Sequence, residues 1–213
     1  MKKILPVCFA ALLFAGCRTS HVITAWKNPR PAENYQKIMV AGVINTPDDS
    51  LRKRIEKNFV DALRNLGYNA ISGIEEFGSH GLENMAQEQT YIALCDRGID
   101  AVITIALIDQ SKADRGSKIS YGYPNNYYYN RIWNYKNIYA DPSNDNKGTN
   151  GKYFWESILF NLRTLEAECT IQTKPFPALN ENKIAREFEK NIIKEMINEK
   201  VIRKIKSDNK KPF

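Results

Sequence analysis

The distribution of hydrophobic and polar residues along the chain predicts alternating strands and helices. An almost uninterrupted apolar run at 36–45, QKIMVAGVIN, predicts a strand covered on both faces. The strongest helical pattern follows, with Thr46 as its expected cap, Pro47 as its first residue and Gly67 as its end. A short strand at 68–72 completes a strand-helix-strand unit. The helix carries apolar residues at three- and four-residue steps: Leu51, Ile55, Phe59, Leu63 and Leu66.

The same alternation continues toward the C-terminus. A weaker helix is expected at 83–97, and the apolar run at 99–108, IDAVITIALI, predicts a central strand. Segments 152–160 and 167–174 predict a hairpin. Met85, Ile92 and Cys95 would form the apolar face of the weaker helix.

A last helix is expected to begin after Asn180. Its apolar residues lie four apart, in a stripe that neighbours widen: Ile184, Phe188, Ile192 and Met196, with Ala185, Ile193 and Ile197. The order of elements predicts an α/β (or α+β) fold, with a mixed β-sheet of about five to six strands flanked by three helices and a Tyr-rich insertion.

The N-terminus has the pattern of a bacterial lipoprotein signal. Lys2 and Lys3 precede an apolar run from Ile4 to Gly16, which is shorter than the about 20 residues that span a bilayer. Cys17 would then be the acylated first residue of the mature chain and its link to the membrane. An ordinary cleaved signal and an uncleaved anchor are the alternatives.

These patterns divide the chain into four parts. We expect a signal peptide at 1–16, a lipidated tether with a first short strand at 17–35, a single α/β domain at 36–202 with an aromatic insertion at 110–151, and a basic tail at 203–213.

The net charge of +7 is concentrated at the two ends of the chain. The signal contributes two lysines and the tail carries five basic residues against Asp208, so the folded body is near neutral. This distribution disfavours a nucleic-acid partner. The tail is interpreted as a solvated end, with contact to anionic lipid or a cell-wall polymer as the alternative.

Two cysteines remain once the signal is removed and Cys17 is acylated. A disulfide between Cys95 and Cys169 is permitted in an oxidising compartment, and two packed free thiols are equally compatible with the sequence.

The segment 121–139, YGYPNNYYYNRIWNYKNIY, is the best candidate for binding because it holds seven of the eleven tyrosines and no acid. Aromatic rings beside cations suit stacking on sugars or on another protein. The alternative is a loop that packs on its own sheet. The expected binding residues are Tyr127, Tyr128, Tyr129, Arg131 and Trp133.

The sequence offers little support for an enzyme. His21 and His80 are the only histidines, and no glycine-rich phosphate loop follows the first firm strand, so we expect no metal and no cofactor. Glu156 lies among apolar residues and is interpreted as a strand-edge or hydrogen-bonded carboxylate with a structural role. Hydrolase chemistry would require a second carboxylate in a shared cleft.

The chain resembles uncharacterised Gram-negative envelope lipoproteins that carry a domain of unknown function. The resemblance rests on Ala25-Trp26-Lys27, KIMVAGVIN, the helix ending at 62–70, GIDAVITIALID, the aromatic loop, the hairpin and the closing helix, in that order. It implies an outer-membrane location, since Arg18 replaces the aspartate of retained lipoproteins. Cys169 departs from the pattern, which has a tryptophan there.

These expectations together indicate a lipid-anchored envelope protein of the outer membrane with a non-enzymatic binding or assembly role. Its partners would be the membrane, through the lipid on Cys17, and an envelope protein or cell-wall glycan. A cell-wall-active enzyme and a regulator of a cell-wall synthase are the alternatives.

Overall fold

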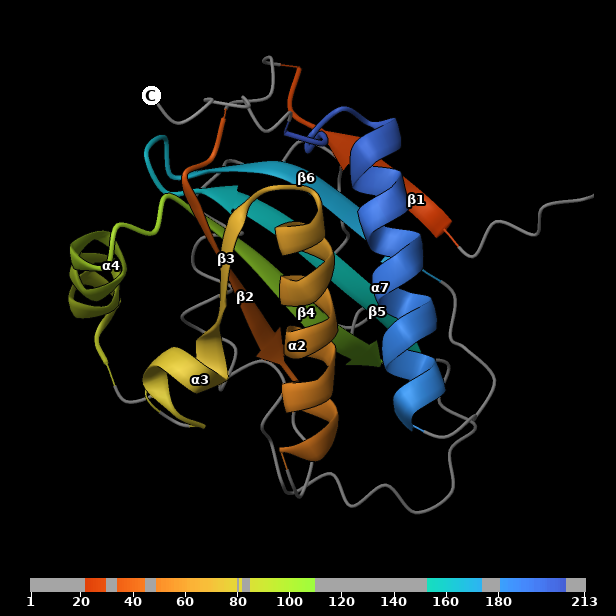
Figure 1. Ribbon diagram of the computed structural model, residues 1–213, viewed down its shortest axis with the longest axis horizontal. Coiled ribbons are helices and arrows are strands. Elements are labelled where there is room, and N and C mark those ends of the chain that lie inside the picture. The colour runs from red at the N-terminus through yellow and green to blue at the C-terminus, as the bar shows by residue number, and fades with distance from the viewer. Residues whose placement is uncertain are drawn as a thin grey trace, which may run out of the picture.

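The computed structural model describes residues 22–29, 34–44, 49–79, 81, 85–109, 153–173 and 181–205. These residues form a six-stranded mixed sheet with helices on its two faces (Figure 1). The α/β fold with a mixed sheet and three main helices is therefore confirmed, and α3 is an additional short helix. The elements are β1 (Val22–Lys27), β2 (Lys37–Val43), α2 (Ser50–Asn65), β3 (Asn69–Ser72), α3 (Gly73–Phe77), α4 (Gln87–Asp96), β4 (Ala101–Asp109), β5 (Tyr153–Asn161), β6 (Glu166–Thr173) and α7 (Glu181–Asn198).

The strands lie in the order β1-β6-β5-β4-β2-β3, and the sheet does not close on itself. Strands β3, β2 and β4 are parallel, whereas β4, β5, β6 and β1 pair antiparallel. The predicted hairpin is confirmed as β5 and β6. Its register shifts where Leu159 pairs with Cys169 and Phe160 with Ala167, which leaves Glu168 as the extra residue.

The main core lies between the sheet and the layer formed by α2 and α7 (Figure 1). Phe188 of α7 contacts Phe59 of α2, with ring centroids 5.5 Å apart, and Trp155 of β5 at 4.9 Å. Alternate residues of β2 and β4 face this layer, and the residues between them, Met39, Ala41 and Val102, pack with Leu94 of α4 on the other face. The prediction that the apolar run at 36–45 is covered on both faces is confirmed.

Two helix predictions need correction. Helix α2 begins at Ser50, with Asp49 at the capping position and no side-chain cap, whereas Thr46 and Pro47 lie outside the described residues. Helix α4 begins at Gln87 and buries Thr90 and Leu94. The predicted face of α4 is wrong: Met85 precedes the helix, and Ile92 and Cys95 are exposed.

The last helix has the predicted apolar stripe, since Ile184 and Ala185, Phe188, Ile192, Ile193 and Met196 are half-buried or buried. Ile197 is 39% exposed and does not belong to the stripe. None of the helices within the described ranges has the length and apolarity required to cross a membrane.

The chain after α7 returns to the connection between α2 and β3. The backbone N–H of Ile205 donates to the carbonyl oxygen of Leu66 at 2.8 Å, and that of Arg203 donates to the Tyr68 hydroxyl at 3.0 Å. Gly67, with φ of +98°, provides the turn that ends α2, as predicted. Residues 203–205 of the predicted tail are thus attached to the domain, and 206–213 lie outside the described residues.

Candidate functional site

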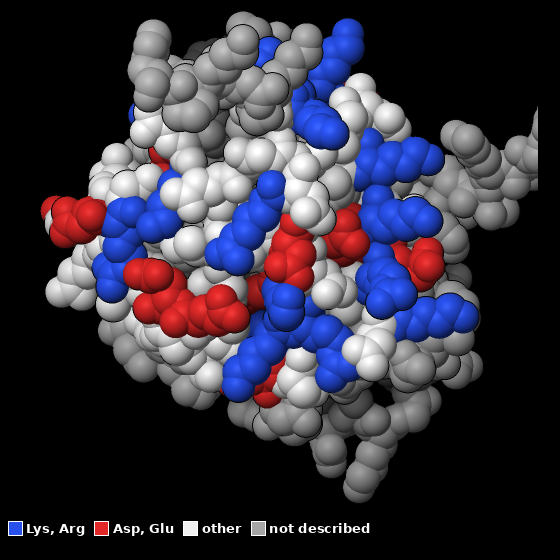
Figure 2. Space-filling model, viewed as in Figure 1, with Lys and Arg blue, Asp and Glu red and all other residues white. Residues whose placement is uncertain are grey.

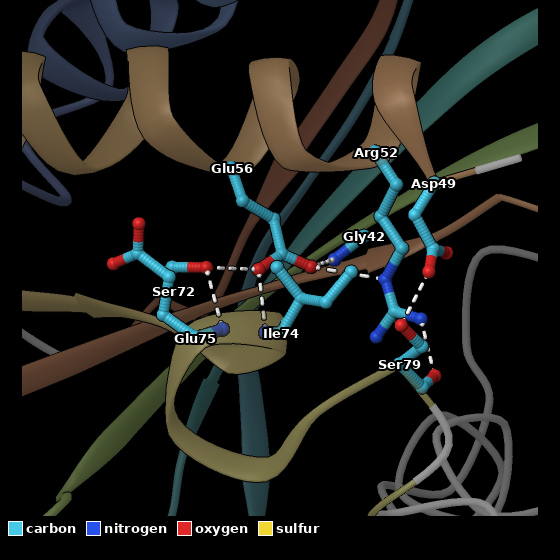
Figure 3. Close-up of polar contacts among 8 residues, drawn as sticks. All are labelled: Gly42, Asp49, Arg52, Glu56, Ser72, Ile74, Glu75 and Ser79. Atoms are coloured by element: carbon cyan, nitrogen blue, oxygen red, sulfur yellow. Dashed lines mark hydrogen bonds and ion pairs between the residues drawn. The ribbon is translucent and has the colours of Figure 1, made fainter.

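A buried carboxylate, Glu56 of α2, lies at the centre of the most extensive polar cluster in the part of the chain that the structure describes (Figure 3). Its Oε1 accepts from the backbone N–H of Gly42 at 2.7 Å and from Arg52 Nε at 3.2 Å. Its Oε2 accepts from the Ser72 hydroxyl at 2.6 Å and from the N–H of Ile74 at 2.8 Å. Each oxygen therefore accepts two hydrogen bonds, which satisfies a fully buried carboxylate.

Two of these donors continue into neighbouring elements. The Ser72 hydroxyl accepts from the N–H of Glu75 at 3.3 Å and so caps α3. Arg52 Nη1 donates to the carbonyl oxygen of Ser79 at 2.7 Å, and the Ser79 hydroxyl donates to the Asp49 carboxylate at the start of α2 (Figure 3). One buried acid thereby links α2, β2, β3 and the chain after α3.

The Glu56 cluster lies near the carboxyl ends of the parallel strands β2 and β3. In open α/β sheets this edge is where ligands bind. Here, however, all four acceptor positions of the carboxylate are occupied by donors from the protein. Glu56 thus has no acceptor position left for a metal, a substrate or a proton from a nucleophile, and its chemistry is structural.

A second buried acid lies at the opposite end of β2, where that strand and β4 begin. Asp100 accepts from the backbone N–H groups of Gln36 at 2.8 Å and Lys37 at 3.0 Å, and Arg163 Nη2 lies 2.5 Å from Oδ2. The acid precedes β4 and binds the chain entering β2, so it aligns the two parallel strands at their starts.

Glu156 is buried in β5, and its carboxylate accepts from Gln172 Nε2 on β6 at 2.8 Å. The expected hydrogen bond of Glu156 is therefore confirmed. Glu168 at the hairpin bulge accepts in the same way from Asn161 Nδ2 at 3.1 Å. Among the described residues, no group of three or more His, Cys, Asp and Glu side chains could hold a metal ion.

Both cysteines of the folded domain are free thiols. Cys169 belongs to the core between the sheet and the α2 and α7 layer, whereas Cys95 is exposed on α4, which packs on the other face. The sheet lies between them, which explains why no bridge forms. The sequence left open a disulfide or two packed free thiols; both thiols are free, but only Cys169 is packed in the core. Burial, followed by the carboxylates of Glu199 and Glu195, raises the pKa of the Cys169 thiol to about 12.

The remaining predicted site residues lie outside the described residues. These are the lipidation site Cys17 and the binding residues of the insertion, Tyr127, Tyr128, Tyr129, Arg131 and Trp133. They stay predictions.

Sequence patterns missed the Glu56 cluster because an acid inside a helix is usually solvated. The position of Glu56 next to the core residue Ile55 was the available signal, since it placed the acid at the border of the apolar stripe. Gly42 was a second signal, because a glycine within a strand can mark a close contact with another element. Only the fold shows that the element is helix α2.

No family model matches the chain, and no curated protein matches it. Solved structures with a similar arrangement include two PelC dodecamers from Paraburkholderia phytofirmans. The first, a PelC variant, is 11% identical, and the match covers 79% of this chain and 94% of the PelC chain with a TM-score of 0.41. The second is also 11% identical, and the match covers 84% of this chain and 98% of the PelC chain with a TM-score of 0.40. Lipoprotein GNA1162 from Neisseria meningitidis is 13% identical, and the match covers 76% of this chain and 96% of the GNA1162 chain with a TM-score of 0.37. TM-scores below 0.5 are too low for the likeness to bear on the function of this chain.

Proposed function

We propose that the chain is a lipid-anchored envelope protein of the outer membrane that acts as a non-enzymatic binding or assembly component. The observation that carries the proposal is the N-terminal pattern, in which Lys2 and Lys3, a short apolar run and Ala15-Gly16 precede Cys17. Several acyl chains on one cysteine would hold the domain on a membrane, because each buried methylene contributes about 0.8 kcal/mol.

The environment of the buried acids supports a role other than catalysis. Glu56, Asp100, Glu156 and Glu168 are the buried carboxylates of the described residues, and each accepts hydrogen bonds from backbone or side-chain donors of the fold. These acids therefore act in holding strands and helices together. In this proposal, recognition is the role of the aromatic insertion at 110–151.

Mass spectrometry of the protein extracted from bacterial membranes tests the anchor. The expected N-terminus is Cys17 with a diacylglyceryl thioether, and detergent partition should place the protein in the detergent phase. A Cys17→Ser variant, which has the same signal but no thiol at the processing site, should carry no diacylglyceryl group in the mass spectrum. An unmodified or uncleaved wild-type N-terminus would reject the proposal.

The binding role is tested by crosslinking in intact cells with and without residues 121–139. The deletion is expected to keep the circular dichroism spectrum and to abolish capture of cell wall or of a protein partner. A variant with phenylalanine at Tyr127, Tyr128 and Tyr129 keeps the rings and separates stacking from hydrogen bonding by the hydroxyls. Capture that survives the deletion would exclude the insertion as the binding segment.

A further inference from the structure

The exposed charges of the layer formed by α2 and α7 are predominantly basic. Figure 2 shows this layer from outside, with basic side chains along both helices and fewer acidic side chains among them. Among the residues whose side chains the structure describes, the charged residues classed as exposed on the two helices are lysines and arginines: Lys53, Lys57, Arg64, Lys183, Arg186, Lys190 and Lys194. We call these seven residues the basic face.

The acids of the same helices are less exposed than these cations. Glu56 is fully buried, and Asp61, Glu187, Glu189 and Glu195 are half-buried. Asp61, whose side chain is 48% exposed, pairs with Lys57 at 2.5 Å. Exposed acids occur on α3 and α4 instead, at Glu75, Glu76, Glu88 and Asp96. The basic face and most of the exposed acids therefore lie on different elements of the described domain.

The basic face ends in exposed apolar side chains. Ile197, at the end of α7, is 39% exposed, and Ile205, whose backbone is bonded to Leu66 at the end of α2, is 40% exposed. Both helices end on the same side of the domain (Figure 1). Isoleucines beside lysines are typical of surfaces that lie at a lipid interface, where apolar side chains enter the headgroup region and cations stay at the phosphates.

Strand β1, which follows the proposed anchor in the sequence, packs against the same core as α7. Val22, at the start of β1, and Ile184 of α7 both pack against that core cluster. Cys17 precedes Val22 by five positions in the sequence, and five fully extended residues span at most about 18 Å, which limits how far an anchor on Cys17 could be from the strand. An anchor on Cys17 would hold α7 close to the membrane surface.

We propose that the basic face of α2 and α7 docks on the anionic phospholipid surface to which the chain is anchored. The inference rests on the proposed lipid anchor for its orientation and on the exposed charges for its chemistry. A membrane suits this face better than a protein partner does, because five of the seven residues are lysines, which are depleted at protein interfaces. Lysines and arginines near an anionic leaflet each favour adsorption.

The test uses the unlipidated chain from Arg18 to Phe213, so its result does not depend on acylation. Sedimentation with vesicles of equal parts phosphatidylglycerol and phosphatidylcholine, at about 0.1 M salt, measures the partition coefficient. The wild type should bind these vesicles, should not bind pure phosphatidylcholine, and should dissociate at about 1 M salt, where screening is nearly complete.

A pair of variants separates the basic face from net charge. Lys190→Gln with Lys194→Gln should lower the partition coefficient roughly 30-fold, at about fivefold per lysine. Gln89→Glu with Thr164→Glu changes net charge by the same amount at exposed positions of α4 and the hairpin turn, and should lower it far less. Both variants keep the tail after Arg203.

Equal losses in the two variants would assign binding to net charge and overturn the proposal. An unchanged partition coefficient in the α7 variant would assign binding to other cations and would also overturn it. Failure of the wild type to bind anionic vesicles would reject a lipid partner, even if the basic face bound a protein. None of these results alters the mass-spectrometric test of Cys17, so the two proposals fail independently.

Discussion

The backbone N–H of Gly42 on strand β2 lies 2.7 Å from Oε1 of Glu56 on helix α2, a contact made at a residue that has no side chain of its own. A Cβ atom on Gly42 would lie 2.8 Å from Cγ of Arg52 and 3.2 Å from that same carboxylate oxygen. The glycine is therefore required by close approach, and its position is linked to a buried acid that binds two strands and a helix.

Replacement of Gly42 by alanine is expected to lower the free energy of unfolding by about 2 kcal/mol, since Arg52 is held by Glu56 and Ser79 and cannot move away freely. Urea denaturation followed by circular dichroism measures the loss. In an Arg52→Ala background the Cγ contact is absent, so the same replacement should cost less. An equal cost in both backgrounds would contradict the proposed contact.

Glu56→Gln is expected to destabilise the domain by about 3 kcal/mol. An amide has one oxygen in place of two, so two donors of the cluster lose their acceptor and Arg52 loses its counter-charge. Thermal unfolding gives the difference. Glu75→Gln, an equal change at an exposed position of α3, is the control and should stay within about 0.5 kcal/mol of the wild type.

The two thiols of the domain should differ sharply in reactivity. In the chain from Arg18 onward, Cys95 is exposed and should react with a disulfide reagent at pH 8 within minutes, whereas Cys169 is buried with its pKa raised to about 12 and should stay unreactive. Two equivalents are expected in denaturant, with or without reductant. Fast reaction of one thiol in a native Cys95→Ser variant would show that Cys169 is accessible.

Glu189 gives the domain a stability that depends on pH. Burial raises the pKa of this carboxyl from 4.5 to about 7, against the lowering effect of Lys190 and Arg186. Below pH 4.5 the carboxyl is protonated in both states; as the pH rises to about 7 the unfolded chain releases its proton first, so the free energy of unfolding falls. Glu189→Gln should therefore gain roughly 1 to 3 kcal/mol over the wild type between pH 4.5 and 7.5.

Urea midpoints across this pH range measure the effect of Glu189→Gln. Glu187→Gln, on the same helix, changes net charge equally and is the control. A difference between the two variants that stays constant with pH would contradict the raised pKa of Glu189.

The spacing of hydrophobic residues along the chain was sufficient to predict most of the helices and strands. The four-residue steps of Ile184, Phe188, Ile192 and Met196 place α7 correctly because one whole side of that helix covers the sheet. The same spacing predicted the wrong face for helix α4. This helix packs on the sheet mainly through Leu94 and Tyr91, and its apolar residue Ile92 is exposed.

The polar clusters could not be predicted because their members come together only in the folded chain. Glu56 binds residues on β2, β3 and α3, and Asp100 binds the chain entering β2 and the hairpin turn at Arg163. In the sequence these acids look like any solvated carboxylate. The basic face could not be predicted for a related reason. Helix α7 contains as many acids as cations, and their different exposure is known only from the folded structure.

The pairing of β1 with β6 determines when the domain can be completed. Val22 pairs with Thr173, so the outer strand finds its partner only after most of the chain has been synthesised. Contacts so distant in sequence form slowly. Until β6 forms, β1 lacks the strand with which it pairs, so the sheet is completed at the edge that begins the described chain only when its C-terminal half is in place.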